Sequence, residues 1–173
     1  MVKKQSADPE YLSWDEYFIA LTILSSLRSK DPKTKVGACI VSEDNRVLSI
    51  GYNGAPNGFP DSLMPWEIRE AKNHFDTKYP YVCHSELNAI LNYRGNMRDL
   101  QGARLYVHYF PCVECTKAII QAGIKEVIYL HDFDHASFGV EQNASFRMFD
   151  VCGIKYRQFK PVGRKEIVLK LED

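Results

Sequence analysis

The sequence predicts an α/β sandwich of three layers (αβα), with helices on both faces of a central mixed sheet of about five strands. Short β-rich runs alternate with helical patterns through the second half of the chain, and a polar turn joins two β-rich runs in the first half. A chain of 173 residues is long enough to bury one continuous core. We therefore expect a polar N-terminal tail over residues 1–10 and a single domain over residues 11–173.

The first predicted element is a helix over residues 14–30. Ser13 and Glu16 have the spacing of a capping box, and Pro32 follows the end of the helical pattern. Between them, apolar residues recur at helical spacing and predict the buried face, namely Phe18, Leu21, Leu24 and Leu27.

A hairpin and a loop are predicted next. Residues 36–41 and 46–53 are β-rich, and the polar residues 42–45 between them indicate a turn. Residues 51–62 are dense in Gly, Pro and Asn and are predicted to form a loop. After this loop, Pro65 could open a short helix that ends by residues 78–80.

The second half of the chain predicts alternating helices and strands. A helix is expected from Ser85 until near Gly95, where its apolar pattern ends. The later elements are a strand at 103–109, a helix at 113–122 closed by Gly123, a strand at 126–130, a helix at 143–152 closed by Gly153, and a strand at 154–159.

Charge, hydropathy and cysteine content indicate which classes of protein this chain does not belong to. The 22 basic residues are balanced by 22 acidic ones, so the overall field expected of a protein that binds polymeric nucleic acid is absent. No apolar run approaches the ~20 residues of a membrane helix, and we expect no membrane contact. Five cysteines with no export signal favour thiols or metal ligands over disulfides. These features predict a cytoplasmic protein.

Three residues far apart in the chain are candidate metal ligands. Cys112 and Cys115 are three residues apart at the start of a predicted helix, so their sulfurs would face the same way. His84, just before another predicted helix, would be the third ligand. Such a set leaves the fourth tetrahedral position for water, as in a catalytic zinc site. Both ligand groups would lie at the positive ends of helices, where thiolate is favoured.

Glu86 is the candidate base beside this metal. Two thiolates cancel the charge of Zn²⁺, so a nearby base is needed to deprotonate the bound water. Residues i and i+2 do not share a helix face, so His84 is expected to precede the helix with non-helical torsions while Glu86 lies in its first turn. Taken singly, each residue has a simpler structural explanation, such as a core histidine or an acid that stabilises a helix start. Only the occurrence of all four residues together, His84, Glu86, Cys112 and Cys115, favours a catalytic site.

The joint pattern resembles a known family. The His-x-Glu motif at residues 84–86 and the Pro-Cys-x-x-Cys motif at residues 111–115 are the signature of zinc-dependent nucleobase deaminases. The flanking stretches RSKDPKTKVGACIV, GYNGAPNG, DTKYPYVCHSELNAI and QAGIKEVIY resemble the deoxycytidylate (dCMP) deaminase family, over about residues 11–159. The resemblance implies a cytidine-deaminase-like fold and zinc-dependent hydrolysis of dCMP to dUMP and ammonia, which supplies dUMP for dTMP synthesis. Water would add to C4 of cytosine while Glu86 moves the protons.

The resemblance also implies the residues that bind substrate. The family usually carries Ala where this chain has Ser85, and the added hydroxyl could perturb Glu86. The candidates are Asn53 for the sugar, the backbone N–H of Ser85 for the pyrimidine carbonyl, Phe110 for the base, and Arg28 with Ser29 for the phosphate.

Regulation and assembly are implied in the same way. The family is activated by dCTP and inhibited by dTTP, with Mg²⁺ accompanying the triphosphate, and it forms homohexamers. The GYNGAPNG stretch resembles the effector-binding loop of the family, in which glycines let backbone N–H groups approach phosphate. The candidate effector residues are Gly51, Asn53, Gly54 and Gly58.

Two other functions remain open. The same zinc site serves polynucleotide deaminases that act on tRNA or single-stranded DNA, although the balanced charge and the RSKDP stretch argue against this. Alternatively, Ser85 could mark a catalytically impaired protein that keeps the deaminase fold and binds nucleotides. Ammonia release from dCMP and from cytosine-containing oligonucleotides separates these functions.

Overall fold

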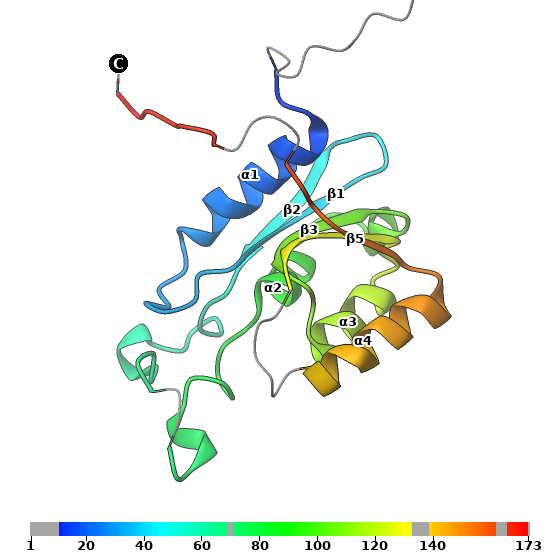
Figure 1. Cartoon of the computed structure of the whole chain (residues 1–173). Coiled ribbons are helices and arrows are strands. Elements are labelled where there is room, and N and C mark those ends of the chain that lie inside the picture. The colour runs from blue at the N-terminus through cyan, green and yellow to red at the C-terminus, as the bar shows by residue number, and fades with distance from the viewer. Residues whose placement is uncertain (1–10, 69–70, 133–138, 162–165, 173) are drawn as a thin grey trace, which may run out of the picture.

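The computed structural model of the chain describes residues 11–68, 71–132, 139–161 and 166–172 (Figure 1). The predicted polar tail over residues 1–10 lies outside the described residues.

A five-stranded mixed sheet lies at the centre of the molecule, with the strand order β2-β1-β3-β4-β5. Strand β1 (Gly37–Val41) pairs antiparallel with β2 (Val47–Tyr52) on one side and with β3 (Arg104–Tyr109) on the other. Strands β3, β4 (Glu126–His131) and β5 (Lys155–Gln158) run parallel. The predicted mixed sheet is confirmed.

Helices cover both faces of this sheet. Because successive side chains of a strand point to opposite faces, Ile40 packs into one core cluster while Cys39 and Val41 pack into another. The second cluster includes Phe18 of α1, and the first includes residues of the other three helices (Figure 1). The predicted three-layer arrangement is therefore confirmed. The helices are α1 (Trp14–Ser26), α2 (Ser85–Asn92), α3 (Val113–Gln121) and α4 (Gly139–Cys152).

Helix α1 begins as predicted but ends earlier. The side-chain oxygen of Ser13 accepts a hydrogen bond from the backbone N–H of Glu16, and the Glu16 carboxylate accepts one from the backbone N–H of Ser13, so the capping box is present. The helix ends at Ser26 and not at Lys30. The backbone N–H of Arg28 donates to the Ser25 carbonyl, a tightened last turn of the kind that often ends an α-helix.

The buried face of α1 agrees with the predicted apolar face at Phe18 and Leu21 but differs from it in the second half of the helix. Leu24 and Leu27 are exposed, whereas the polar residues Thr22, Ser25 and Ser26 are buried. The physical reason is a close approach to the sheet: a Cβ atom at Gly37 of β1 would lie 2.0 Å from the Thr22 carbonyl oxygen. Small residues are needed where a helix lies this close to a strand, and leucines would not fit between them.

The helix predicted after Pro65 is wrong for the described part of that segment. One short 3₁₀ helix, η2 (His74–Asp76), forms in the described part of that segment, and another, η1 (Asp61–Leu63), precedes Pro65. The backbone N–H of Ile68 donates to the Pro65 carbonyl, which closes a turn. The other helices and strands begin and end close to the predicted residues, although α4 begins at Gly139, ahead of the predicted start. In the described residues, every helix is too short or too polar to cross a membrane.

Candidate metal and catalytic site

The starts of two helices bring the predicted metal ligands together. His84 is the N-cap of α2, with an extended backbone (φ −72°, ψ 156°), as its predicted non-helical torsions required. Cys112 is the N-cap of α3, with a similar backbone (φ −68°, ψ 169°). Cys115 lies in the first turn of α3. Helices α2 and α3 pack on the same face of the sheet, and their N-terminal ends meet at this point.

The three side chains converge on one small space. The Sγ atoms of Cys112 and Cys115 lie 3.4 Å and 3.5 Å from Nδ1 of His84. All three ligand atoms lie within 4.8 Å of one another, and within the described residues no fourth His, Cys, Asp or Glu joins the group. One imidazole nitrogen with two thiols is a donor set that suits Zn²⁺, whereas Mg²⁺ and Ca²⁺ prefer oxygen. The residues therefore fit a zinc ion that keeps an open coordination position.

The three groups shift one another's pKa values. A hydrogen bond with Cys112 raises the pKa of His84, and its effect exceeds the opposing effect of burial. Hydrogen bonds from Cys115 and His84 lower the pKa of Cys112, whereas the neighbouring Cys112 and burial raise the pKa of Cys115. At least one thiolate is thus favoured by the local geometry, and thiolate is the form that binds a metal.

Glu86 lies in the first turn of α2 and is buried, with 6% of its surface exposed. Burial raises the pKa of its carboxyl group, and the nearby His84 opposes this effect. A carboxylate with a raised pKa is a better proton acceptor, so this environment suits a general base.

Ser85 is fully buried and contacts this base directly. Its hydroxyl donates a hydrogen bond of 2.9 Å to Oε2 of Glu86. As the first residue of α2, Ser85 also has a backbone N–H without a partner inside the helix, which is the group predicted to bind a pyrimidine carbonyl. That contact stays a prediction.

Asn53 lies next to a short antiparallel pairing with the segment that carries His84. The backbone groups of Gly54 and Cys83 form two hydrogen bonds of 3.0 Å and 2.8 Å. Asn53 precedes Gly54 and His84 follows Cys83. Because the two segments run antiparallel, the pairing places Asn53 opposite His84. The Asn53 side chain is buried and bonds to backbone groups of Thr34 and Val36. Its predicted contact with a sugar is not tested.

The remaining predicted substrate residues lie in different surroundings. Phe110 is 1% exposed, and its ring packs in an aromatic cluster that includes Phe146, whose centroid is 4.2 Å away. This packing gives Phe110 a role in the core, and its contact with a base stays a prediction. Arg28 is exposed, while Ser29 is buried and accepts a hydrogen bond from the backbone N–H of Asp31.

The glycines of the predicted effector loop are not equivalent. A Cβ atom at Gly51 would lie 2.2 Å from the Ser85 carbonyl oxygen, so this glycine lets α2 approach β2. A Cβ atom at Gly54 would meet only a Tyr52 ring carbon at 3.9 Å. Gly58 is exposed and has a positive φ of 85°, which an L side chain rarely adopts. A role in effector binding stays a prediction.

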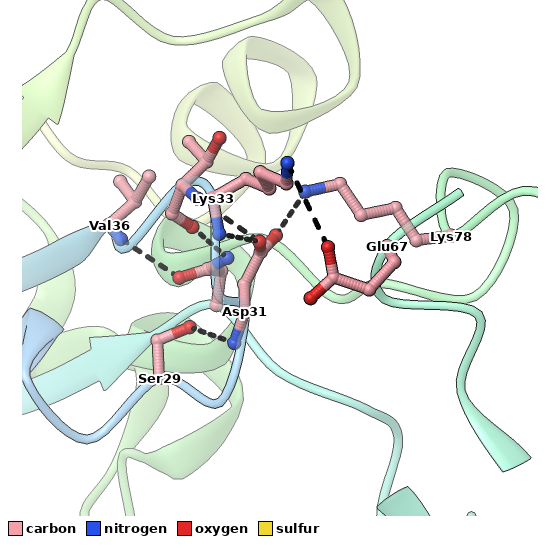
Figure 2. A network of polar contacts seen from close by, with 8 residues as sticks. Ser29, Asp31, Lys33, Val36, Glu67 and Lys78 are labelled. Carbon is pink, nitrogen blue, oxygen red and sulfur yellow. Dashed lines mark hydrogen bonds and ion pairs between the residues drawn. The ribbon is translucent and has the colours of Figure 1, made fainter. Parts of the chain in front are cut away.

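Sequence reasoning missed a buried ion pair between Asp31 and Lys78 (Figure 2). Their side chains are 2% and 4% exposed. Charged residues are mostly exposed, and these two are 47 positions apart, so neither periodicity nor composition points to the pair. Both lie inside stretches that carried the family resemblance, RSKDP and DTKYP, which is the signal that could have found them.

Comparison with known proteins agrees with this site. The family model of the cytidine and deoxycytidylate deaminase zinc-binding region matches residues 12–131. A deoxycytidylate deaminase of Homo sapiens is 52% identical over 159 residues, which cover 92% of this chain and 86% of that protein. A probable deoxycytidylate deaminase of Drosophila melanogaster is 48% identical over 158 residues, 88% of this chain and 75% of that protein.

The fold is also found among solved structures. The crystal structure of dCMP deaminase from the cyanophage S-TIM5, in complex with dCMP and dUMP, matches with a TM-score of 0.63 at 23% sequence identity. The match covers 86% of this chain and all of that chain (100%). At this identity the likeness concerns the fold.

Proposed function

Because this chain belongs to the family of cytidine and deoxycytidylate deaminases, we propose that it is a hydrolase that converts dCMP to dUMP and ammonia. The observation that carries the proposal is the convergence of His84, Cys112 and Cys115 beside the buried carboxylate of Glu86. Identities of about half to named deoxycytidylate deaminases, over most of the chain, support dCMP as the substrate.

The chemistry divides between the metal and the protein. Zn²⁺ held by the three ligands would supply a Lewis acid that makes a water molecule easier to deprotonate. Glu86 takes the proton of the attacking water, whose oxygen adds to C4 of the cytosine ring. Glu86 gives this proton to N3. It then takes the proton of the new hydroxyl group on C4 and delivers it to the C4 amino group, the C4–N bond breaks, and ammonia leaves. No redox cofactor takes part in this hydrolysis.

Other side chains position the nucleotide. The Ser85 backbone N–H binds the pyrimidine carbonyl, and the Asn53 amide binds the sugar. Arg28 and Ser29 are the proposed phosphate ligands, supported by the exposed guanidinium of Arg28 at the end of α1. Phe110 contributes by holding the segment before Cys112 against the aromatic core.

Regulation and metabolic role are proposed on the same premise. The product dUMP would feed dTMP synthesis, with dCTP as activator and dTTP as inhibitor. Mg²⁺ would accompany the triphosphate at the loop that contains Gly54 and Gly58, and the assembly would be a homohexamer. The exposed backbone at Gly58, which is open around its Cα, suits the close approach of a phosphate.

One structural observation supports an impaired enzyme as a second candidate. The hydrogen bond from the Ser85 hydroxyl occupies an oxygen of the catalytic carboxylate and lowers the pKa of Glu86 against the larger effect of burial. A weaker base would slow proton transfer without preventing nucleotide binding.

A direct assay decides between these functions. The zinc-loaded protein is incubated with dCMP, with and without dCTP and dTTP, and with cytosine-containing oligonucleotides, and released ammonia is measured. We expect the zinc-loaded protein to release ammonia from dCMP. Turnover of oligonucleotide only would establish a polynucleotide deaminase. Binding of zinc with no turnover of dCMP, even with dCTP present, would establish the impaired protein.

A further inference from the structure

We propose that the buried ion pair of Asp31 and Lys78 positions the side-chain amide of Asn53 to bind the sugar of a pyrimidine nucleotide. The inference rests on the proposed function, and it assigns a positioning role to two residues outside the metal site. The network that carries it joins the segment of residues 29–36 to Lys78 (Figure 2), and hydrogen bonds join the same segment to Asn53.

The ion pair fixes the turn that follows α1. The Asp31 carboxylate accepts hydrogen bonds from the backbone N–H groups of Lys33 at 2.9 Å and Thr34 at 3.0 Å, while its other oxygen pairs with the Lys78 ammonium. Both charged side chains are almost fully buried, so each depends on the other for its counter-charge. Loss of the ammonium would leave the carboxylate buried as an unpaired anion, and the turn would have to open toward water.

This turn then fixes Asn53. The Thr34 carbonyl accepts a hydrogen bond of 2.8 Å from Nδ2 of Asn53, and the Val36 backbone N–H donates one of 2.8 Å to Oδ1. The backbone N–H of Asn53 also donates to the Val36 carbonyl at 3.0 Å. Because Oδ1 must face an N–H and Nδ2 must face a carbonyl, only one orientation of the amide satisfies both contacts.

This orientation determines what Asn53 can offer a ligand. Its amide nitrogen has two hydrogens, and the contact with Thr34 uses one of them. The second is a donor, so the side chain suits an acceptor such as a sugar oxygen. A flipped amide would present its oxygen instead, and it would lose both backbone contacts.

The position of Asn53 connects this network to the chemistry. Asn53 stands opposite His84 through the Gly54–Cys83 pairing. Lys78 lies on the segment that leads into His84, and its carbonyl accepts hydrogen bonds from the backbone N–H groups of Tyr81 and Val82. The ion pair therefore joins the segment that orients Asn53 to the segment that carries a metal ligand.

The test uses a Lys78→Met variant of the full-length, zinc-loaded protein, with Lys33→Met as the matched control. Lys33 lies in the same turn as Asp31 and pairs with Glu67 at 3.8 Å, but these side chains are 50% and 70% exposed. Amide hydrogen exchange reports the position of the turn, and steady-state kinetics with dCMP reports its consequence. Lys78→Arg keeps the charge and serves as the rescue variant.

We expect the rate of hydrogen exchange at the Val36 and Asn53 backbone amides to rise in Lys78→Met. The exchange rate along β3 should rise less than at these two amides. The KM for dCMP should rise about five- to tenfold, at unchanged zinc content and with kcat little changed, because an interaction made equally in the ground state and the transition state is weakened. Lys33→Met should behave as the parent protein, and Lys78→Arg should restore most of the affinity.

Two results would overturn the inference. The first is exchange at Val36 and Asn53 that stays unchanged, or that rises only as much as in β3, since an equal rise reports global destabilisation. The second is a shifted exchange pattern with an unchanged KM.

If Lys78→Met does not fold, Asp31→Asn is combined with it, because the amide that replaces the carboxylate keeps an acceptor for the turn and no charge is buried. If the parent protein does not turn over dCMP, the proposed function fails, while hydrogen exchange still decides whether the pair positions Asn53.

Discussion

The hydroxyl of Ser85 donates a hydrogen bond of 2.9 Å to the carboxylate of Glu86, and both side chains are buried at the start of α2. A hydrogen bond to a carboxylate favours its charged form and makes it a weaker base. The residue between the metal ligand and the base therefore acts on the proposed chemistry through its side chain as well as through its backbone.

Removing this hydroxyl tests its effect on the base. We expect Ser85→Ala to raise kcat for dCMP by about two- to tenfold, since the free carboxylate accepts a proton more readily. The measurement is steady-state ammonia release at matched zinc content. Ser49→Ala, at a buried serine of β2 outside the site, is the control and should leave kcat unchanged. A fall in kcat would show instead that the hydroxyl holds Glu86 in its working orientation.

The role of Glu86 as proton carrier predicts a specific loss. Glu86→Gln should keep its zinc and lower kcat by about 10²- to 10⁴-fold, because an amide cannot carry the proton. Metal analysis and kinetics on the same sample provide the check. Glu114→Gln, at an exposed acid in the first turn of α3, should retain full activity. Substantial turnover by Glu86→Gln is incompatible with the mechanism.

The metal ligands predict a linked loss of zinc and stability. Cys112→Ala should bind little zinc, and a chelator that lowers the Tm of the parent protein should leave the Tm of this variant unchanged. Calorimetry with and without chelator measures the difference. Cys152→Ala serves as the control because Cys152 is exposed at the end of α4. Zinc binding by Cys112→Ala at the parent level would show that the metal is held elsewhere.

The contact between β2 and α2 predicts that Gly51 cannot be replaced. A Cβ atom there would lie 2.2 Å from the Ser85 carbonyl oxygen and 2.4 Å from the Ala89 nitrogen. Gly51→Ala should therefore lower the free energy of unfolding by about 2–3 kcal/mol, as overpacking against backbone does. Urea denaturation measures this change. Gly54→Ala, where the nearest atom is 3.9 Å away, should change it far less, and equal effects would argue against the packing explanation.

Asp15 predicts a stability contribution that depends on pH. Burial acts to raise the pKa of Asp15, but hydrogen bonds from Arg157 and Tyr106 outweigh it and hold this pKa below its ordinary value of 3.8. A depressed carboxyl pKa stabilises the fold above pH 3.8, and this contribution is lost as the pH falls through the lowered value.

A comparison of Asp15→Asn with the parent protein should show this dependence. The difference in the free energy of unfolding should be about 1 kcal/mol at neutral pH and should shrink in acid, where both proteins lack the charge. Denaturation over a pH series measures it. Glu67→Gln, at an exposed pair with Lys33, should show little difference at any pH. A difference that grows on acidification would contradict the sign of the shift.

Much of the fold could be predicted because its signals are local. The capping box at Ser13, the alternation of the strands and the glycine that closes α3 each depend on neighbours within a few residues. The three candidate metal ligands could also be identified, since ligand spacing at helix starts follows from the chemistry of the metal. Their convergence then required only that α2 and α3 pack side by side.

Other features depend on contacts between distant segments, and sequence reasoning missed them. The later part of the buried face of α1, from Thr22 to Ser26, is polar because Gly37 brings the strand too close for leucines. Pro65 suggested the start of a short helix, but the described part of the segment after it forms turns and the 3₁₀ helix η2.

The sequence by itself determined the chemistry of this protein: an imidazole, two thiols and a carboxylate at helix starts, and the order of helices and strands that brings them together. Only the tertiary structure decided how these groups are held. In the folded chain Asp31 is buried in an ion pair with Lys78, the Asn53 amide donates a hydrogen bond to the Thr34 carbonyl, and the Ser85 hydroxyl donates one to Glu86. The physical reason is the separation along the chain of the residues that interact. Helix caps, strands and ligand spacing depend on near neighbours, whereas burial and ion pairing depend on which distant segments pack together in the sandwich.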